Sequence, residues 1–180
     1  MQDTGMVRRI DELGRVVIPK EIRKTLRIKE GDPLEIYTDK EELVLKKYSP
    51  MASLGDFSSS VAEGIEKITD NSCIITDTDK VLFVSGKDKS LEGKNLSDKM
   101  NGIMKERKSV LISCGDGGEA VKITDSDKGA ENQIIVPIVS NGDCYGTVVV
   151  FDNDKTRRFN SGDVKFARLC AFVLSKQFEN

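Results

Sequence analysis

Histidine is absent from this 180-residue sequence. Histidine is the commonest general base, the commonest catalytic partner of serine and cysteine, and the commonest metal ligand, so its absence argues against an enzyme. The cysteines are also too scattered to form a C-x-x-C pair, which leaves no local zinc or thiol-redox motif. These cysteines are Cys73, Cys114, Cys144 and Cys170. We therefore expect no catalytic activity, no cofactor and no metal site.

Long apolar segments are missing as well. No stretch approaches the roughly 20 consecutive apolar residues that span a bilayer. The N-terminal segment MQDTGMVRRIDE lacks the apolar core of a secretory signal. We expect a cytoplasmic protein without a membrane partner.

The glycine-rich segments do not complete a nucleotide-binding motif. A P-loop has four residues between its glycines and Ser or Thr after its lysine. In SGKDKSLEGKNLSDK (85–99), six residues separate Gly86 from Gly93, and Asn95 follows the lysine. The second segment, SCGDGGEA (113–120), joins two predicted strands, whereas a dinucleotide fingerprint opens a helix. We interpret the first segment as a solvated loop and the second as a turn.

Charge is present but unevenly distributed. The net charge of the chain is −2. Residues 1–29 contain eight Lys or Arg against four Asp or Glu, whereas residues 30–180 contain 20 basic and 26 acidic side chains. Such an asymmetry indicates a basic module joined to an acidic one.

The basic N-terminal part has the pattern of two strand pairs around a short helix. Alternating or β-branched residues predict strands at 6–10, 15–19, 33–38 and 42–47, and Pro19 suits the start of a helix. Fewer than about 50 residues without a disulfide or metal rarely support an independent core. We therefore expect this part to be an obligate dimer, in which two copies share their apolar faces.

The remainder of the chain predicts a single α+β domain. Residues 53–69 have the spacing of an amphipathic helix, for which packing on its own domain and pairing with a second subunit are both open. Several strands follow, including one at 119–124 and a hairpin closed by Asn141-Gly142. The last helix, 161–178, is apolar on more than one side and so needs two partners. This order predicts an antiparallel sheet flanked by helices.

Basic residues gather on the short N-terminal helix and on the hairpin before it. On the helix, Ile22 and Leu26 face a core, and a separate face carries Lys20, Arg23, Lys24 and Arg27. The hairpin adds Arg8, Arg9 and Arg15. By itself, this basic helical face is explained by an ordinary solvated helix. Dimerisation, however, would present every basic group twice, and guanidinium groups bind phosphate with two hydrogen bonds. Because no aromatic residue is interleaved for base stacking, duplex DNA is the leading partner.

These residues carry a family resemblance. Residues 4–50, and above all R-x-I-D-E-L-G-R-V-V-I-P-K-E-I-R from Arg8 to Arg23, closely resemble the AbrB-type swapped-hairpin DNA-binding domain of bacterial transition-state regulators. The resemblance implies a β-barrel formed by interleaved hairpins of two chains. It also implies loosely specific DNA contacts from arginines at the positions of Arg8, Arg15 and Arg23. The next family arginine is Lys24 here, which keeps the charge but not the two-pronged geometry. With Arg9 and Lys20 as further phosphate contacts, the expected DNA-binding residues are Arg8, Arg9, Arg15, Lys20, Arg23 and Lys24.

The whole chain resembles sporulation regulators that join an AbrB-type head to a C-terminal GAF-type domain. The resemblance implies a transcriptional activator and repressor of forespore genes. The expected domains are the DNA-binding head (1–50), a junction and linker helix (51–70), and a GAF-like domain (71–180) on which helix 53–69 packs.

Three alternatives stay open. An antitoxin-type interaction protein shares the same head, although antitoxins usually end in a short tail instead of the roughly 125 patterned residues found here. The GAF-like domain could be an enzyme or a cyclic-nucleotide sensor, or bind another unidentified small-molecule effector, although the sequence shows no ligand signature; otherwise it serves oligomerisation and signal coupling. Dimer and tetramer are both open, and the apolar faces of helices 53–69 and 161–178 favour the tetramer.

Overall fold

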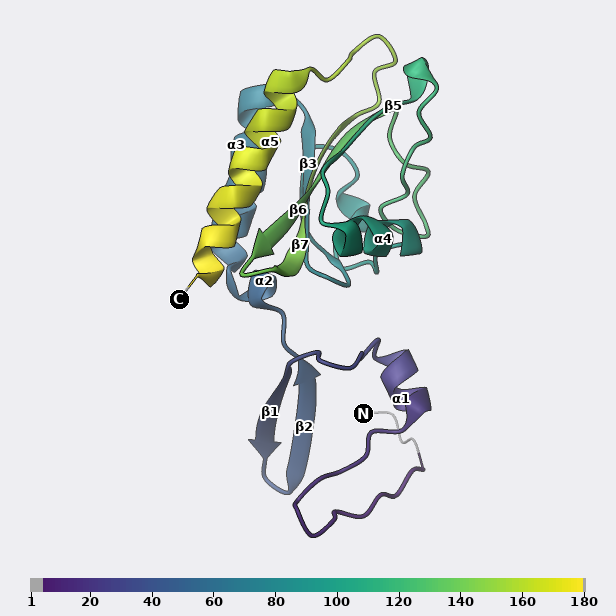
Figure 1. The fold of residues 1–180 in the computed structure, drawn as a ribbon, viewed down its shortest axis with the longest axis vertical. Coiled ribbons are helices and arrows are strands. Elements are labelled where there is room, and N and C mark those ends of the chain that lie inside the picture. The colour runs from purple at the N-terminus through teal and green to yellow at the C-terminus, as the bar shows by residue number, and fades with distance from the viewer. Residues whose placement is uncertain (1–4, 180) are drawn as a thin grey trace. The chain divides into compact units, whose positions relative to one another are not determined.

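The computed structural model describes residues 5–179 and divides the chain into two compact units (Figure 1). We call Met1–Tyr48 unit 1 and Ser49–Asn180 unit 2. No helix within the described residues has the length and apolar character needed to cross a membrane.

Unit 1 consists of a helix, a two-stranded sheet and an extended hairpin. Helix α1 spans Lys20–Thr25, and strands β1 (Leu34–Asp39) and β2 (Glu42–Lys47) pair in antiparallel register. Pro19 is the N-cap of α1, one position before its first turn. The strands predicted at 33–38 and 42–47 are thus confirmed.

The strands predicted at 6–10 and 15–19 are not formed as paired strands in one chain. The turn between them is present, because the N–H of Asp11 donates to the carbonyl of Arg15 at 3.1 Å. Beyond this turn the described residues on both sides are extended without a ladder. A strand needs a neighbour for its backbone hydrogen bonds, and one chain supplies none here.

Unit 1 has almost no interior of its own. Among its described residues only Pro19 is buried. Large apolar side chains are exposed throughout, and the exposed fraction reaches 84% for Val7, 75% for Leu13 and 74% for Val17. The expectation that two copies must share a core therefore has direct physical support.

Unit 2 is built on a five-stranded antiparallel sheet with the order β4-β3-β7-β6-β5. The strands are β3 (Ser72–Thr76), β4 (Val81–Ser85), β5 (Val110–Ser113), β6 (Asn132–Ser140) and β7 (Asp143–Asp152). The helices are α2 (Pro50–Ser53), α3 (Gly55–Thr69), α4 (Asp98–Glu106) and α5 (Ser161–Ser175). Short 3₁₀ turns are η1 (Lys89–Leu91), η2 (Cys114–Asp116) and η3 (Lys176–Phe178). The predicted α+β class is confirmed.

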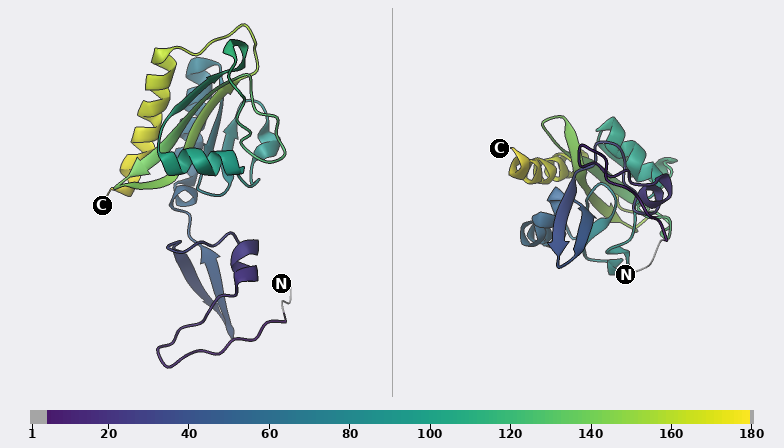
Figure 2. Two further views of the ribbon diagram at one scale, coloured as in Figure 1. Left: turned by 45° about the vertical axis from the view of Figure 1, so that its right-hand side comes forward. Right: turned by 90° about the horizontal axis from the view of Figure 1, so that it is seen from below.

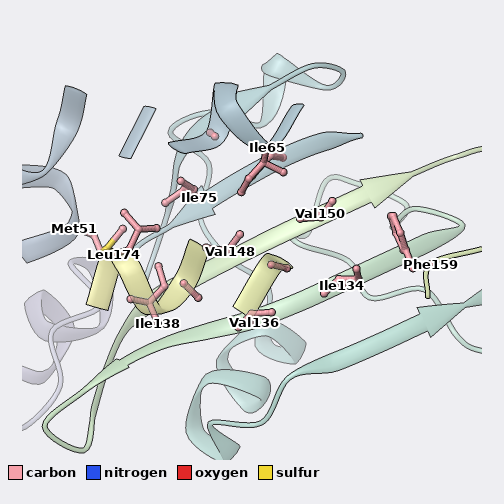
Figure 3. Close-up of a cluster of buried hydrophobic side chains, with 14 residues drawn as sticks. Met51, Ile65, Ile75, Ile134, Val136, Ile138, Val148, Val150, Phe159 and Leu174 are labelled. Atoms are coloured by element: carbon pink, nitrogen blue, oxygen red, sulfur yellow. The ribbon is translucent and has the colours of Figure 1, made fainter. Parts of the chain in front are cut away.

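Helices cover both faces of this sheet (Figures 1 and 2). Helices α3 and α5 lie side by side on one face, with Ile65 of α3 and Leu174 of α5 in a single buried cluster. Figure 3 shows Ile75, Val148 and Val136 of this cluster, which come from neighbouring strands. A second cluster on the other face contains Met100 and Met104 of α4.

The residues that directly follow unit 1 are packed into unit 2. Met51 of α2 is fully buried in the α3–α5 cluster. Ser49 caps α2 by accepting from the N–H of Ala52, and its hydroxyl donates to the carboxylate of Asp77 at 2.8 Å. Residues from Ser49 onward are therefore packed as part of unit 2.

One predicted strand of unit 2, at 119–124, is absent. Its apolar residues Val121 and Ile123 are buried as the alternation suggested. However, the side chain of Gln133 bonds the backbone of Val121, since its Oε1 accepts from the N–H at 2.7 Å and its Nε2 donates to the carbonyl at 2.8 Å. A buried side-chain amide thus replaces the neighbouring strand, and only an isolated bridge between Leu96 and Thr124 remains.

Candidate nucleic-acid interface

The first hairpin turn of unit 1 is organised by Asp11. Its carbonyl accepts from the N–H of Gly14 at 3.0 Å, and Gly14 takes φ +74°, the left-handed conformation typical of a three-residue hairpin loop. One carboxylate oxygen accepts from the N–H of Leu13 at 3.0 Å and of Arg15 at 2.8 Å. The other accepts from Nε of Arg15 at 2.7 Å.

These contacts also fix the charge of the turn. The backbone N–H of Arg15, followed by its side chain, lowers the pKa of the Asp11 carboxyl below its ordinary value of 3.8. Asp11 is thus ionised at neutral pH, and the neighbouring basic side chains favour its charged form. An acidic turn is predicted here from the sequence, but the contact between Asp11 and Arg15, a predicted DNA-binding residue, is not.

The two remaining arginines of the hairpin are exposed. Arg8 donates from Nη1 to the carbonyl of Val7 at 3.1 Å, which restrains its side chain along the backbone. Within residues 5–179, Arg9 has no side-chain hydrogen bond or ion pair. Neither is held in an ion pair within the described residues, so both side chains are available to an anion.

Helix α1 carries Lys20, Arg23 and Lys24, and all three side chains are exposed. None of these side chains has a hydrogen bond or ion pair to another described residue. The hairpin arginines and the α1 cations are likewise not bonded to each other within residues 5–179.

Arg27 does not belong to the helical stripe that the spacing predicted. The helix ends at Thr25 with Leu26 as its C-cap, and the N–H of Ile28 donates to the carbonyl of Arg23 at 2.8 Å. Arg27 itself has φ +53°, the left-handed position of this type of helix end. The helical backbone thus ends before Arg27 can join the face that carries Lys20 and Arg23.

Unit 2 contains a cavity of about 370 Å³ beside the sheet. Its lining includes apolar Ile74, Leu91 and Phe151 together with charged side chains of both signs. Two of the lining residues are joined directly, because Nζ of Lys94 donates to the hydroxyl of Ser126 at 3.2 Å. The cavity is large enough for a small metabolite.

Helices α3 and α5 also expose apolar side chains on the side that does not face the sheet. We call this set the outer helix face; it consists of Phe57, Ile68, Leu169, Phe172 and Val173. The ammonium of Lys176 lies 4.9 Å from the ring centroid of Phe172 and covers part of it. Exposed large apolar side chains on neighbouring helices are typical of interaction surfaces.

Two family models match the chain. The model described as "Stage V sporulation protein T C-terminal, transcription factor" matches residues 53–179. The model described as "Antidote-toxin recognition MazE, bacterial antitoxin" matches residues 7–53.

Individual relatives give the same division. Stage V sporulation protein T of Bacillus subtilis (strain 168) is 44% identical over 183 residues, covering 99% of each chain. Transition state regulatory protein AbrB of the same organism is 64% identical over 50 residues, which are 28% of this chain and 52% of that one.

A solved structure supports the fold of the C-terminal part. The GAF domain of an Acinetobacter phosphoenolpyruvate-protein phosphotransferase superposes with a TM-score of 0.56 at 13% identity, covering 73% of this chain and 82% of that one. At this identity the likeness shows a GAF-like fold and no shared ligand. The chain belongs to the stage V sporulation protein T family and is a sporulation transcription regulator, with an AbrB-like DNA-binding domain followed by a GAF-like domain.

Proposed function

We propose that two copies of unit 1 interleave their hairpins into one β-barrel that binds duplex DNA through Arg8, Arg9, Arg15, Lys20, Arg23 and Lys24. The observation that carries this proposal is the 64% identity to AbrB over 50 residues, together with a cationic set whose members are all exposed. In this arrangement each basic side chain is present twice on one symmetric assembly.

Dimerisation follows from the apolar surface of unit 1. Val7, Leu13 and Val17 are each at least 74% exposed in one chain. Burial of apolar surface contributes about 25 cal/mol per Å², so covering several such side chains supplies several kcal/mol per chain. The extended segments on either side of the Asp11 turn would then gain the strand neighbours that one chain lacks.

DNA contacts of this kind are mainly to phosphates. Arginine binds a phosphate with two parallel hydrogen bonds, whereas Lys24 acts as a point charge. Contacts to the backbone position a protein without reading bases, and DNA shape then supplies selectivity. Loose sequence preference and a steep salt dependence are the expected consequences.

Unit 2 is proposed to assemble and modulate the regulator. The apolar side chains of the outer helix face would be buried if two dimers packed through this face. Such packing would make a tetramer. The cavity beside Ile74 and Phe151 offers a place for an unidentified small-molecule effector. We propose the domains 1–50, 51–70 and 71–180, with the middle segment packed on the last; burial of Met51 in the unit 2 core supports this.

The family also suggests the cellular setting and the absence of catalysis. We propose a cytoplasmic protein that activates and represses genes in the forespore. It acts by binding and not as an enzyme, since the matched family is described as a transcription factor.

The antitoxin alternative has one observation in its favour, the MazE model that matches residues 7–53. Residues 53–179 instead form a folded α+β domain of the sporulation family. Co-purification of this chain with a small toxin would support the alternative.

Duplex binding by the full chain tests the proposal. Fluorescence anisotropy with a duplex selected by the protein from a random-sequence pool gives affinity at several salt concentrations. Arg15→Ala and Arg23→Ala should each weaken binding and reduce the salt slope by about one for each phosphate that is no longer neutralised. Lys46→Ala is the matched control, because Lys46 is an exposed cation of β2 outside the proposed set. Unchanged affinity in both arginine variants would overturn the assignment.

A further inference from the structure

The carboxylate of Asp11 is anchored by the backbone, and this distinguishes it from an ordinary surface ion-pair partner. It accepts two main-chain N–H groups, those of Leu13 and Arg15. The main chain of Asp11 also makes both hydrogen bonds that close the turn. The position of its second oxygen, which accepts from Nε of Arg15, is therefore set by the turn itself.

Arg15 retains most of its binding capacity in this contact. A guanidinium group has five N–H donors, and only the one on Nε is used by Asp11. Within residues 5–179 no acceptor is bonded to its terminal nitrogens, and 71% of the side-chain surface is exposed. These terminal nitrogens carry the parallel donors that a phosphate accepts.

Fixing one nitrogen of a long side chain has a consequence for binding. A free arginine loses rotamer freedom when it is immobilised on a ligand, and a restrained one has already lost it. Asp11 restrains Arg15 at the nitrogen nearest the stem, which limits the orientations of the whole planar group. The carboxylate also repels DNA phosphates, so orientation and repulsion act in opposite directions.

We propose that Asp11 is a positioning residue, which holds the Arg15 guanidinium so that its terminal nitrogens bind a DNA phosphate. This inference rests on the proposed function of unit 1. It predicts that orientation outweighs repulsion, so that removing the charge of Asp11 weakens duplex binding although the protein becomes more positive.

The test compares Asp11→Asn with Glu12→Gln in the full chain, using the selected duplex and anisotropy at fixed salt. Asparagine keeps an oxygen for the backbone N–H groups but loses the ionic contact with Nε. Glu12 is exposed in the same turn and its side chain has no hydrogen bond or ion pair within residues 5–179, so Glu12→Gln removes an equal charge without touching Arg15. We expect about three- to tenfold weaker binding for Asp11→Asn, and unchanged or tighter binding for Glu12→Gln.

A double-mutant cycle separates positioning from a general effect on the turn. If Asp11 acts through Arg15, Asp11→Asn causes no further loss of affinity in the Arg15→Ala background, where only the relief of repulsion remains. An equal loss in both backgrounds, or an affinity of Asp11→Asn equal to that of Glu12→Gln, overturns the inference. Failure of the proposed function gives a different result, because Arg15→Ala alone would then bind like the wild type.

A second variant covers the case in which Asp11→Asn does not fold, which circular dichroism reports. Arg15→Lys keeps the positive charge and leaves Asp11 in place, but lysine has no Nε–H donor. We expect it to lose at least the same three- to tenfold factor, since an ammonium group also lacks the two parallel hydrogen bonds of a guanidinium, while its salt slope stays unchanged. Full affinity in Arg15→Lys would overturn the inference, because charge alone would then suffice.

Discussion

Gln133 provides the most direct test of how unit 2 is held together. Its side chain is buried, with 1% exposed, and it satisfies both backbone hydrogen-bonding groups of Val121. Replacing it with leucine keeps the approximate volume but leaves a buried N–H and a buried carbonyl without partners. Each such group costs about 1–3 kcal/mol, so Gln133→Leu should lower the free energy of unfolding of unit 2 by about 2–6 kcal/mol.

Urea denaturation of the full chain, followed by circular dichroism, measures this loss. At acidic pH Gln133→Glu should cost less than Gln133→Leu, because a protonated carboxyl both accepts from the N–H of Val121 and donates to its carbonyl, whereas a buried ionised carboxylate could not donate. Gln177→Leu is the control, since Gln177 is exposed on η3. A loss below about 0.5 kcal/mol for Gln133→Leu would refute the reasoning, because it would show that Val121 finds other partners at no cost.

Three further predictions concern assembly, thiol reactivity and pH. The double variant Leu169→Asp, Phe172→Asp should convert the proposed tetramer to a dimer, because two charges then lie on the outer helix face. Sedimentation velocity measures the mass of the assembly, and an unchanged mass would contradict that interface. Cys73 should resist alkylation in the native protein, since burial raises the pKa of its thiol and closes access to it; mass spectrometry should find it labelled only at the rate of unfolding, and rapid labelling would contradict the packing. The backbone N–H and side chain of Arg15 lower the pKa of Asp11. The ionised Asp11 carboxylate should therefore stabilise the turn fully above pH 3.8, and this stabilisation should disappear as the pH falls through the lowered pKa. Carboxyl NMR titration would locate that midpoint, and a value at or above 3.8 would contradict the Arg15 contact.

Features fixed by local chemistry were predictable from the sequence. The Asn141-Gly142 turn is an example, since both residues adopt positive φ, +50° and +86°, and join β6 to β7 as their types require. Helix 161–178 is confirmed as α5 and η3, and its excess of apolar residues appears as an exposed face.

Features that depend on a distant side chain or on a second chain were not predictable in this way. Residues 119–124 alternate like a strand, but only the position of Gln133 in the fold shows that a side chain takes the place of a neighbouring strand. The segments 6–10 and 15–19 have strand composition and no partner within one chain. For the DNA-binding set, residue types identified the cations, whereas the role of Asp11 depends on a turn geometry that the spacing alone did not reveal.

Native mass spectrometry of the full chain bound to the selected duplex tests the central claim most directly. If unit 1 forms its DNA-binding surface only when two chains interleave, the smallest DNA-bound species contains two chains per duplex. Titration to low protein concentration should then produce free DNA and free protein without an intermediate. A stable complex of one chain with one duplex would contradict the account, because a single copy of unit 1 would then be sufficient to bind DNA.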